Sequence, residues 1–181
     1  MLYKEITPHI RTLTTDAFPT YVIQKLLAHG PRVYFGILIA NLMGHVLDLS
    51  LHLYGCRVIQ KAFEISGIDQ QIEMAKELES NLFKCIFDQH ANHAIQKCIE
   101  CVQPQYIQFI YRRLCGRAKM LSTHPYGCHV VQKMLEFCKV YHGDSRLCKG
   151  AVGRPIWKLH CAVHCGAWRT SSSTNYYVEI C

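Results

Sequence analysis

Four glutamine–lysine pairs recur at a constant spacing of 36 residues, at 24–25, 60–61, 96–97 and 132–133. Each glutamine follows a small or amide residue by four positions and a flat or cationic residue by three. We call these three residues a trio; the four trios are Thr20, Tyr21 and Gln24; Cys56, Arg57 and Gln60; Asn92, His93 and Gln96; and Cys128, His129 and Gln132. Flat groups can stack on a nucleobase and an amide can hydrogen-bond its edge, so a trio could bind one base.

A polar strip on an amphipathic helix is usually only its solvated face. The composition of solvated faces drifts from copy to copy, whereas glutamine returns here in all four. The invariant glutamine with its flat neighbour therefore favours recognition of a ligand over simple solvation.

A second, apolar set of positions keeps the same 36-residue step, in the columns Ile6, Leu42, Leu78, Leu114 and Leu13, Leu49, Cys85, Leu121. In the second copy, the apolar spacing predicts helices near 46–50, 56–65 and 72–78. Gly30, Gly67 and Pro104 separate the second helix from the third. A unit of this size cannot bury its apolar face alone, so the units must stack into an α-solenoid.

The second helix of each unit must position the trio. At about 100° per residue, its apolar residues share one arc, with Val58, Ile59, Ala62 and Phe63 as the example. Cys56, Arg57 and Gln60 fall outside that arc. We therefore expect all three members of a trio on the side that is not packed.

Three stretches carry a resemblance to a known family: YGCRVIQK at 54–61, NHAIQKCIECVQPQ at 92–105 and LSTHPYGCHVVQK at 121–133. They closely resemble the Pumilio, or PUF, family of RNA-binding repeat proteins, over about residues 5–140. The resemblance implies an all-α, curved α-solenoid of about four 36-residue, three-helix repeats within residues 1–140. The repeats would be centred near 21, 57, 93 and 129, with a partial N-terminal unit and a divergent tail at 141–181.

The resemblance also implies that the concave face binds single-stranded RNA in antiparallel orientation, one base per repeat. The implied base-edge residues are Thr20, Gln24, Cys56, Gln60, Asn92, Gln96, Cys128 and Gln132, and the implied stacking residues are Tyr21, Arg57, His93 and His129. Cysteine with glutamine resembles the adenine reader and asparagine with glutamine the uracil reader, so the implied sequence is 5′-A-U-A-U-3′. No trio ends in glutamate, the family's acceptor for guanine.

The expected function is sequence-specific binding of AU-rich elements in mRNA 3′ untranslated regions, regulating translation and mRNA stability in the cytoplasm. The resemblance also implies that effector proteins bind the convex face. The family's full array has about twice as many repeats, and the remaining ones read a 5′ UGU core. We therefore expect weak binding unless the chain oligomerises or has a partner. The alternatives are a protein-binding α-solenoid and a weakly functional truncated member of the family.

Composition narrows the possible classes of protein. The chain has 181 residues, of which 50% are hydrophobic and 18% charged, so it can bury a core, and its net charge of +7 permits an anionic partner. No basic start followed by an apolar run is seen in residues 1–10, and no apolar stretch is long enough for a membrane span, so neither a signal peptide nor a membrane partner is expected. Of the 11 cysteines, those within apolar helical patterns are expected to be small buried residues in a reducing compartment; examples are Cys85, Cys98, Cys115 and Cys138.

We expect neither catalysis nor a cofactor, metal ion or small-molecule substrate. Cys128 and His129 are adjacent on a helix and point about 100° apart, which does not suit a thiol–imidazole pair. In the tail, His160-Cys161 and His164-Cys165 offer zinc-ligand atoms, but their spacing fits no standard ligand pair.

Overall fold

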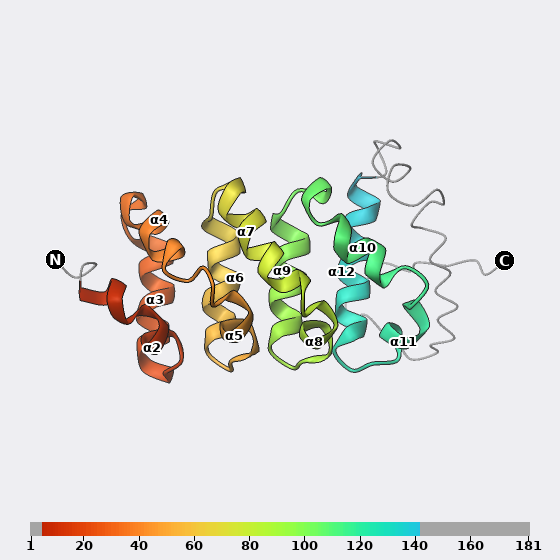
Figure 1. Ribbon diagram of the computed structural model, residues 1–181, viewed down its shortest axis with the longest axis horizontal. Coiled ribbons are helices and arrows are strands. Elements are labelled where there is room, and N and C mark those ends of the chain that lie inside the picture. The colour runs from red at the N-terminus through yellow and green to blue at the C-terminus, as the bar shows by residue number, and fades with distance from the viewer. Residues whose placement is uncertain (1–4, 142–181) are drawn as a thin grey trace, which may run out of the picture.

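The computed structural model describes residues 5–141, and in this range every regular element is a helix (Figure 1). The first unit contains the 3-10 helix η1 (Thr7–His9), α2 (Ile10–Thr14), α3 (Ala17–His29) and α4 (Arg32–Ala40). The second contains α5 (Val46–Leu51), α6 (Gly55–Ile65) and α7 (Ile68–Glu79). The third contains α8 (Leu82–Phe87), α9 (Ala91–Cys101), η2 (Pro104–Tyr106) and α10 (Gln108–Leu114), and the fourth contains α11 (Ala118–Ser122) and α12 (Gly127–Tyr141).

The second helices of the four units form the spine of the molecule. In Figure 1, α3, α6, α9 and α12 stand side by side in chain order, and each packs against the next. The predicted fold class, a helical solenoid of three-helix repeats, is confirmed. A partial N-terminal unit was expected, with only the end of a first helix. The structure gives that unit all three helices, and α2 is as long as α11, at five residues.

The core consists of periodic apolar columns along this spine. One column faces inward within each unit and contains Ile23, Ile59, Ile95 and Val131, which are at most 8% exposed. Burying an aliphatic side chain of this size contributes about 1.5–3 kcal/mol, so this column stabilises each unit from within. A second column, Leu27, Phe63 and Ile99, lies where each second helix packs against the following one and is 0–2% exposed, so the stacked units also stabilise one another.

Two glycines make the turns between units. Gly44 and Gly116 have φ values of 78° and 77°, in the left-handed region that residues with a Cβ rarely adopt. The carboxylate of Glu77 accepts hydrogen bonds from the backbone N–H groups of Gly44 at 2.7 Å and Val46 at 3.0 Å. Glu77 therefore holds this turn and satisfies an N–H group at the start of α5.

The buried cysteines behave largely as predicted. Cys85 and Cys98 are fully buried, and burial raises the pKa of the Cys85 thiol to about 11, so it stays protonated. The prediction for Cys115 was wrong: it follows the last turn of α10 and is exposed. The side chain of Cys138 and the pairs His160-Cys161 and His164-Cys165 lie outside the described residues.

Within residues 5–141, no helix combines the length and the apolar character needed to cross a lipid bilayer. In the same range, no three histidine, cysteine or acidic side chains lie close enough together to hold a metal ion.

Candidate RNA-binding groove

A capping side chain sets where each second helix begins. Asp88 Oδ1 accepts hydrogen bonds from the backbone N–H groups of His90 and Ala91, both at 2.8 Å. At the equivalent place in the fourth unit, His124 Nδ1 accepts from Tyr126 and Gly127, both at 3.2 Å. Asp16 and His52 occupy the same column in the first two units and also accept backbone hydrogen bonds. These caps fix the start of the helix and with it the orientation of the trio.

The first residue of every trio is buried, which differs from the expectation that it lies on the unpacked side. Thr20, Cys56, Asn92 and Cys128 are 1–7% exposed. Each side chain hydrogen-bonds backbone carbonyl groups before its own helix. For example, Asn92 Nδ2 donates to the carbonyl oxygens of Asp88 at 2.9 Å and Gln89 at 3.1 Å. Carbonyl groups that follow the short first helix have no partner within it, and this side chain supplies donors to them.

The other three units repeat this arrangement with different chemistry. The Thr20 hydroxyl donates to the Thr14 carbonyl at 2.8 Å. The thiols of Cys56 and Cys128 donate to the carbonyl oxygens of Leu53 at 3.4 Å and Pro125 at 3.1 Å, respectively. A hydroxyl, a thiol and an amide therefore all serve as the donor at one structural position.

The remaining two members of each trio are progressively more accessible. The four glutamines are half-buried, and the four flat residues Tyr21, Arg57, His93 and His129 are exposed. Tyr21 is 62% exposed, and Lys25 Nζ lies 5.4 Å from the centre of its ring. Within each trio, exposure thus increases from the buried donor to the half-buried amide and then to the exposed flat group.

Two of the glutamines are held by hydrogen bonds within their trio. Gln96 Nε2 donates to Asn92 Oδ1 at 2.8 Å. Gln60 Nε2 donates to the backbone carbonyl of Cys56 at 3.1 Å. Each bond uses one of the two N–H groups of the amide, so the second remains available to a ligand.

Neighbouring trios meet in one open groove. Residues from three consecutive units line it, namely Gln24, Leu53, Cys56, Arg57, Gln60, Lys61, Glu64, His90 and His93. The complete trio of the second unit therefore lies beside Gln24 of the first unit and His93 of the third. Spacing predicted that each trio lies on one side of its helix, and the family resemblance implied that the trios share one face.

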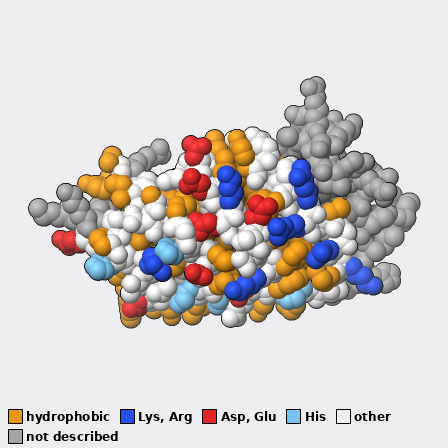
Figure 2. Space-filling model, viewed as in Figure 1, with side chains coloured by type: hydrophobic (Ala, Val, Ile, Leu, Met, Phe, Trp, Pro, Cys, Tyr) orange, Lys and Arg blue, Asp and Glu red, His pale blue; other side chains and the backbone are white. Residues whose placement is uncertain are grey.

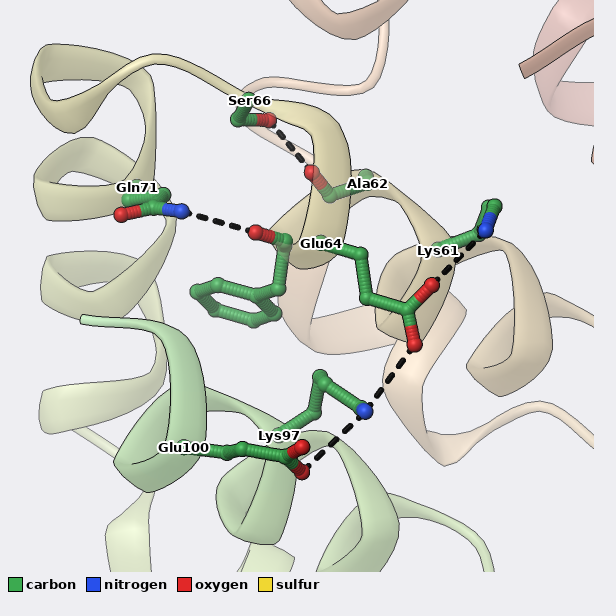
Figure 3. A network of polar contacts seen from close by, with 8 residues as sticks. Lys61, Ala62, Glu64, Ser66, Gln71, Lys97 and Glu100 are labelled. Atoms are coloured by element: carbon green, nitrogen blue, oxygen red, sulfur yellow. Dashed lines mark hydrogen bonds and ion pairs between the residues drawn. The ribbon is translucent and has the colours of Figure 1, made fainter. Parts of the chain in front are cut away.

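A chain of ion pairs borders the groove and was not predicted (Figure 3). The Glu64 carboxylate pairs with Lys61 at 2.8 Å in its own unit and with Lys97 at 2.9 Å in the next. Lys97 also pairs with Glu100 at 3.1 Å. The hydrogen bond from Lys61 is the largest cause of the lowered pKa of Glu64. The lysine that follows each glutamine in the sequence could have indicated these ion pairs, but the sequence analysis gave it no role.

Although His93 is exposed, partial desolvation in the groove lowers the pKa of its imidazole, and the positive charges of His129, His90 and Arg57 lower it further. These causes favour the neutral imidazole, a state suited to stacking. Figure 2 shows lysine and arginine side chains gathered over the C-terminal half of one face. In the third unit, Arg112 and Arg113 are exposed.

Comparisons with known proteins agree with this geometry. The model of the family "Pumilio-family RNA binding repeat" matches residues 9–43, 45–79, 84–115 and 118–141. Pumilio homolog 1 of Xenopus laevis is 48% identical over 130 residues, covering 71% of this chain and 11% of that protein. Suppressor protein MPT5 of Saccharomyces cerevisiae is 31% identical over 147 residues, covering 76% of this chain and 17% of that protein.

Solved structures show the same likeness. The Puf3 RNA-binding domain bound to a recognition site of the Cox17 RNA 3′ untranslated region superposes with a TM-score of 0.72 at 41% identity, covering 75% of this chain and 39% of that one. PUF-8 in complex with PBE-RNA gives a TM-score of 0.71 at 35% identity, covering 75% of this chain and 40% of that one. The chain thus spans less than half the length of these relatives. Four matched repeats, a stacked three-helix fold and these likenesses together show that the chain belongs to the Pumilio family of RNA-binding repeat proteins, which are not enzymes.

Proposed function

We propose that this chain binds single-stranded RNA sequence-specifically, with each trio reading one base. The observation that carries the proposal is the groove in which Cys56, Arg57 and Gln60 lie beside Gln24 and His93. Exposed flat groups from successive units offer faces on which bases stack, and the half-buried amides below them offer hydrogen bonds. Relatives of the same fold bind RNA, among them Puf3 on a 3′ untranslated region.

The third unit suits uracil. Both N–H groups of Asn92 donate to backbone carbonyls, and its oxygen accepts from Gln96. Asn92 therefore has one acceptor site left, which can take the N3–H of uracil, while the second N–H of Gln96 donates to a uracil carbonyl. Cytosine presents a lone pair at N3 instead, which would face the Asn92 oxygen without a proton between them.

The second unit suits adenine. The bond from Gln60 to the Cys56 carbonyl fixes the orientation of the amide. Its second N–H can donate to adenine N1, and its oxygen can accept from the adenine amino group. Guanine presents a donor at N1 and an acceptor at O6, the reverse pattern. Because the Cys56 hydrogen is directed to Leu53, the small sulfur only makes room for the base.

Extending this assignment to the remaining trios gives 5′-A-U-A-U-3′, in which Cys128 and Gln132 read the first base and Thr20 and Gln24 the last. Tyr21, Arg57, His93 and His129 are the stacking residues. Such sites occur in AU-rich elements, so the proposed role is regulation of translation and stability of mRNAs through their 3′ untranslated regions.

The test is fluorescence anisotropy with a labelled RNA containing 5′-AUAU-3′ and with each single-base variant of it. Gln60→Ala should remove the preference for adenine at the third base, and Gln96→Ala the preference for uracil at the second. Each loss should amount to about 1–3 kcal/mol, or about 5- to 150-fold in Kd. Gln105→Ala, at an exposed glutamine whose side chain bonds to Gln103, is the matched control. Unchanged affinity and unchanged base preference in both groove variants would refute the assignment.

A further inference from the structure

The first unit exposes an apolar residue that every later unit buries. Val22 on α3 is 47% exposed, whereas Val58, Ala94 and Val130 at the equivalent positions are each 0% exposed. Those three are covered because α6, α9 and α12 each pack against the second helix of the preceding unit. Val22 therefore marks a face shaped to receive the end of another repeat.

The last unit shows the complementary pattern. Leu27, Phe63 and Ile99 occupy one column of the second helices and are 0–2% exposed, because this column is covered by the following unit. Leu135 holds the same position on α12 and is 37% exposed. Within residues 5–141, the array thus presents one half of a repeat junction at each end, the Val22 face and the Leu135 face.

An ion pair at the junction between the second and third units indicates which partner fits. Inside the array, Lys97 reaches back to Glu64 of the preceding unit at 2.9 Å (Figure 3). The residues equivalent to this pair at the two ends are Lys25 on the Val22 face and Glu136 on the Leu135 face, and both are exposed. Where later units carry Glu64, Glu100 and Glu136, the first unit has Ala28, so Lys25 has no acidic side chain at that position in its own unit.

We propose that the Val22 face of one copy docks on the Leu135 face of a second copy, head to tail. Val22 then lies against the Leu135 face as α6, which carries Val58, lies against α3, which carries Leu27, within the array. Lys25 pairs with Glu136 as Lys97 pairs with Glu64. Such a contact is heterologous, so each added copy leaves both kinds of face free at the ends of the assembly. The contact needs no RNA, and it stands or falls separately from the proposed function.

The test is sedimentation velocity of the 181-residue chain without RNA over a range of concentrations. The wild type should show mass that grows with concentration beyond a dimer. Val22→Glu and Leu135→Glu should each be monomeric, since each destroys one face. Mixed in equal amounts, the two variants should form a dimer and nothing larger, because one intact face of each kind remains. Circular dichroism confirms that the exposed substitutions leave the helices folded.

The ion pair provides a second, independent readout. Lys25→Glu and Glu136→Lys should each weaken association, and the double variant should restore it. A wild type that stays monomeric throughout would overturn the proposal. So would a mixture of Val22→Glu and Leu135→Glu that stays monomeric, or association of Val22→Glu alone, which would indicate a symmetric contact instead.

Discussion

At the scale of single residues, the trios of the second and third units each combine a buried side chain that hydrogen-bonds the backbone with a glutamine that has used one of its two N–H groups. Asn92 donates twice to the backbone and accepts from Gln96, so its position is set before any ligand arrives. Gln96 keeps one N–H for the ligand. Less side-chain freedom is then lost on binding, which favours affinity and specificity together.

His93 gives the array a pH dependence that can be measured without RNA. Because burial and nearby positive charges lower its pKa in the folded chain below the ordinary 6.5, the unfolded chain binds more protons between the two values. The free energy of unfolding should therefore be fully retained above about pH 6.5 and should fall as pH drops through the lowered folded pKa. We expect His93→Gln to lose less stability than the wild type between about pH 7.5 and about pH 5.5 in urea titrations.

The comparison isolates His93 because the other histidines are common to both proteins. An equal loss of stability in wild type and variant would show that the imidazole of His93 gains no protons on unfolding. A larger loss in the variant would mean that the folded chain binds more protons at His93 than the unfolded chain does, so that folding raises rather than lowers its pKa.

At the scale of elements, close contact between the first and second helices of a unit depends on glycine. A Cβ at Gly55 would lie 2.6 Å from the backbone oxygen of Leu49, an approach that only backbone movement can relieve. Gly55→Ala should therefore push α6 away from α5 and lower the free energy of unfolding by about 1–3 kcal/mol. Urea unfolding followed by circular dichroism measures this loss.

Gly67 supplies the matched control. It precedes α7, has a φ of −68°, and a Cβ there meets no atom within 4 Å. Gly67→Ala should leave stability unchanged or raise it by up to about 1 kcal/mol through the unfolded chain. Equal unfolding midpoints for the two variants would contradict the steric argument.

The sequence predicted the helices well because their apolar columns repeat with the period of the units. Val58 and Ile59 reveal a packed face from spacing alone. The burial of Asn92 and Cys56 could not be predicted in the same way, because a helical wheel omits the connection before the helix, whose carbonyls these side chains bind. The caps escaped notice because aspartate and histidine alternate in that column. Cys115 was misjudged because it follows the last turn of α10, where the helical pattern no longer applies.

At the scale of the whole molecule, the number of stacked units sets how many bases one groove can read. Four trios give few base contacts, and stacking contributes about 1–3 kcal/mol per base before the cost of ordering the RNA. Head-to-tail association would place two sets of four trios in one line, with the first unit of one copy beside the fourth unit of another. The groove would then continue across the junction, and a longer RNA could bind both copies.

This continuity predicts cooperative binding to tandem sites. The wild type should bind 5′-AUAUAUAU-3′ with a steeper and tighter anisotropy curve than 5′-AUAUCCCC-3′, because the RNA raises the effective concentration of one copy beside the other. Val22→Glu is the informative control. It keeps every trio, so it can bind each overlapping site on the tandem RNA, but it lacks the contact between copies. This variant should still bind the tandem RNA more tightly than the single-site RNA, because the tandem RNA offers several overlapping sites. Its anisotropy curve should no longer be steeper. Equal steepness for Val22→Glu and wild type would mean that adjacent copies bind the RNA independently, so that the groove ends at Tyr21.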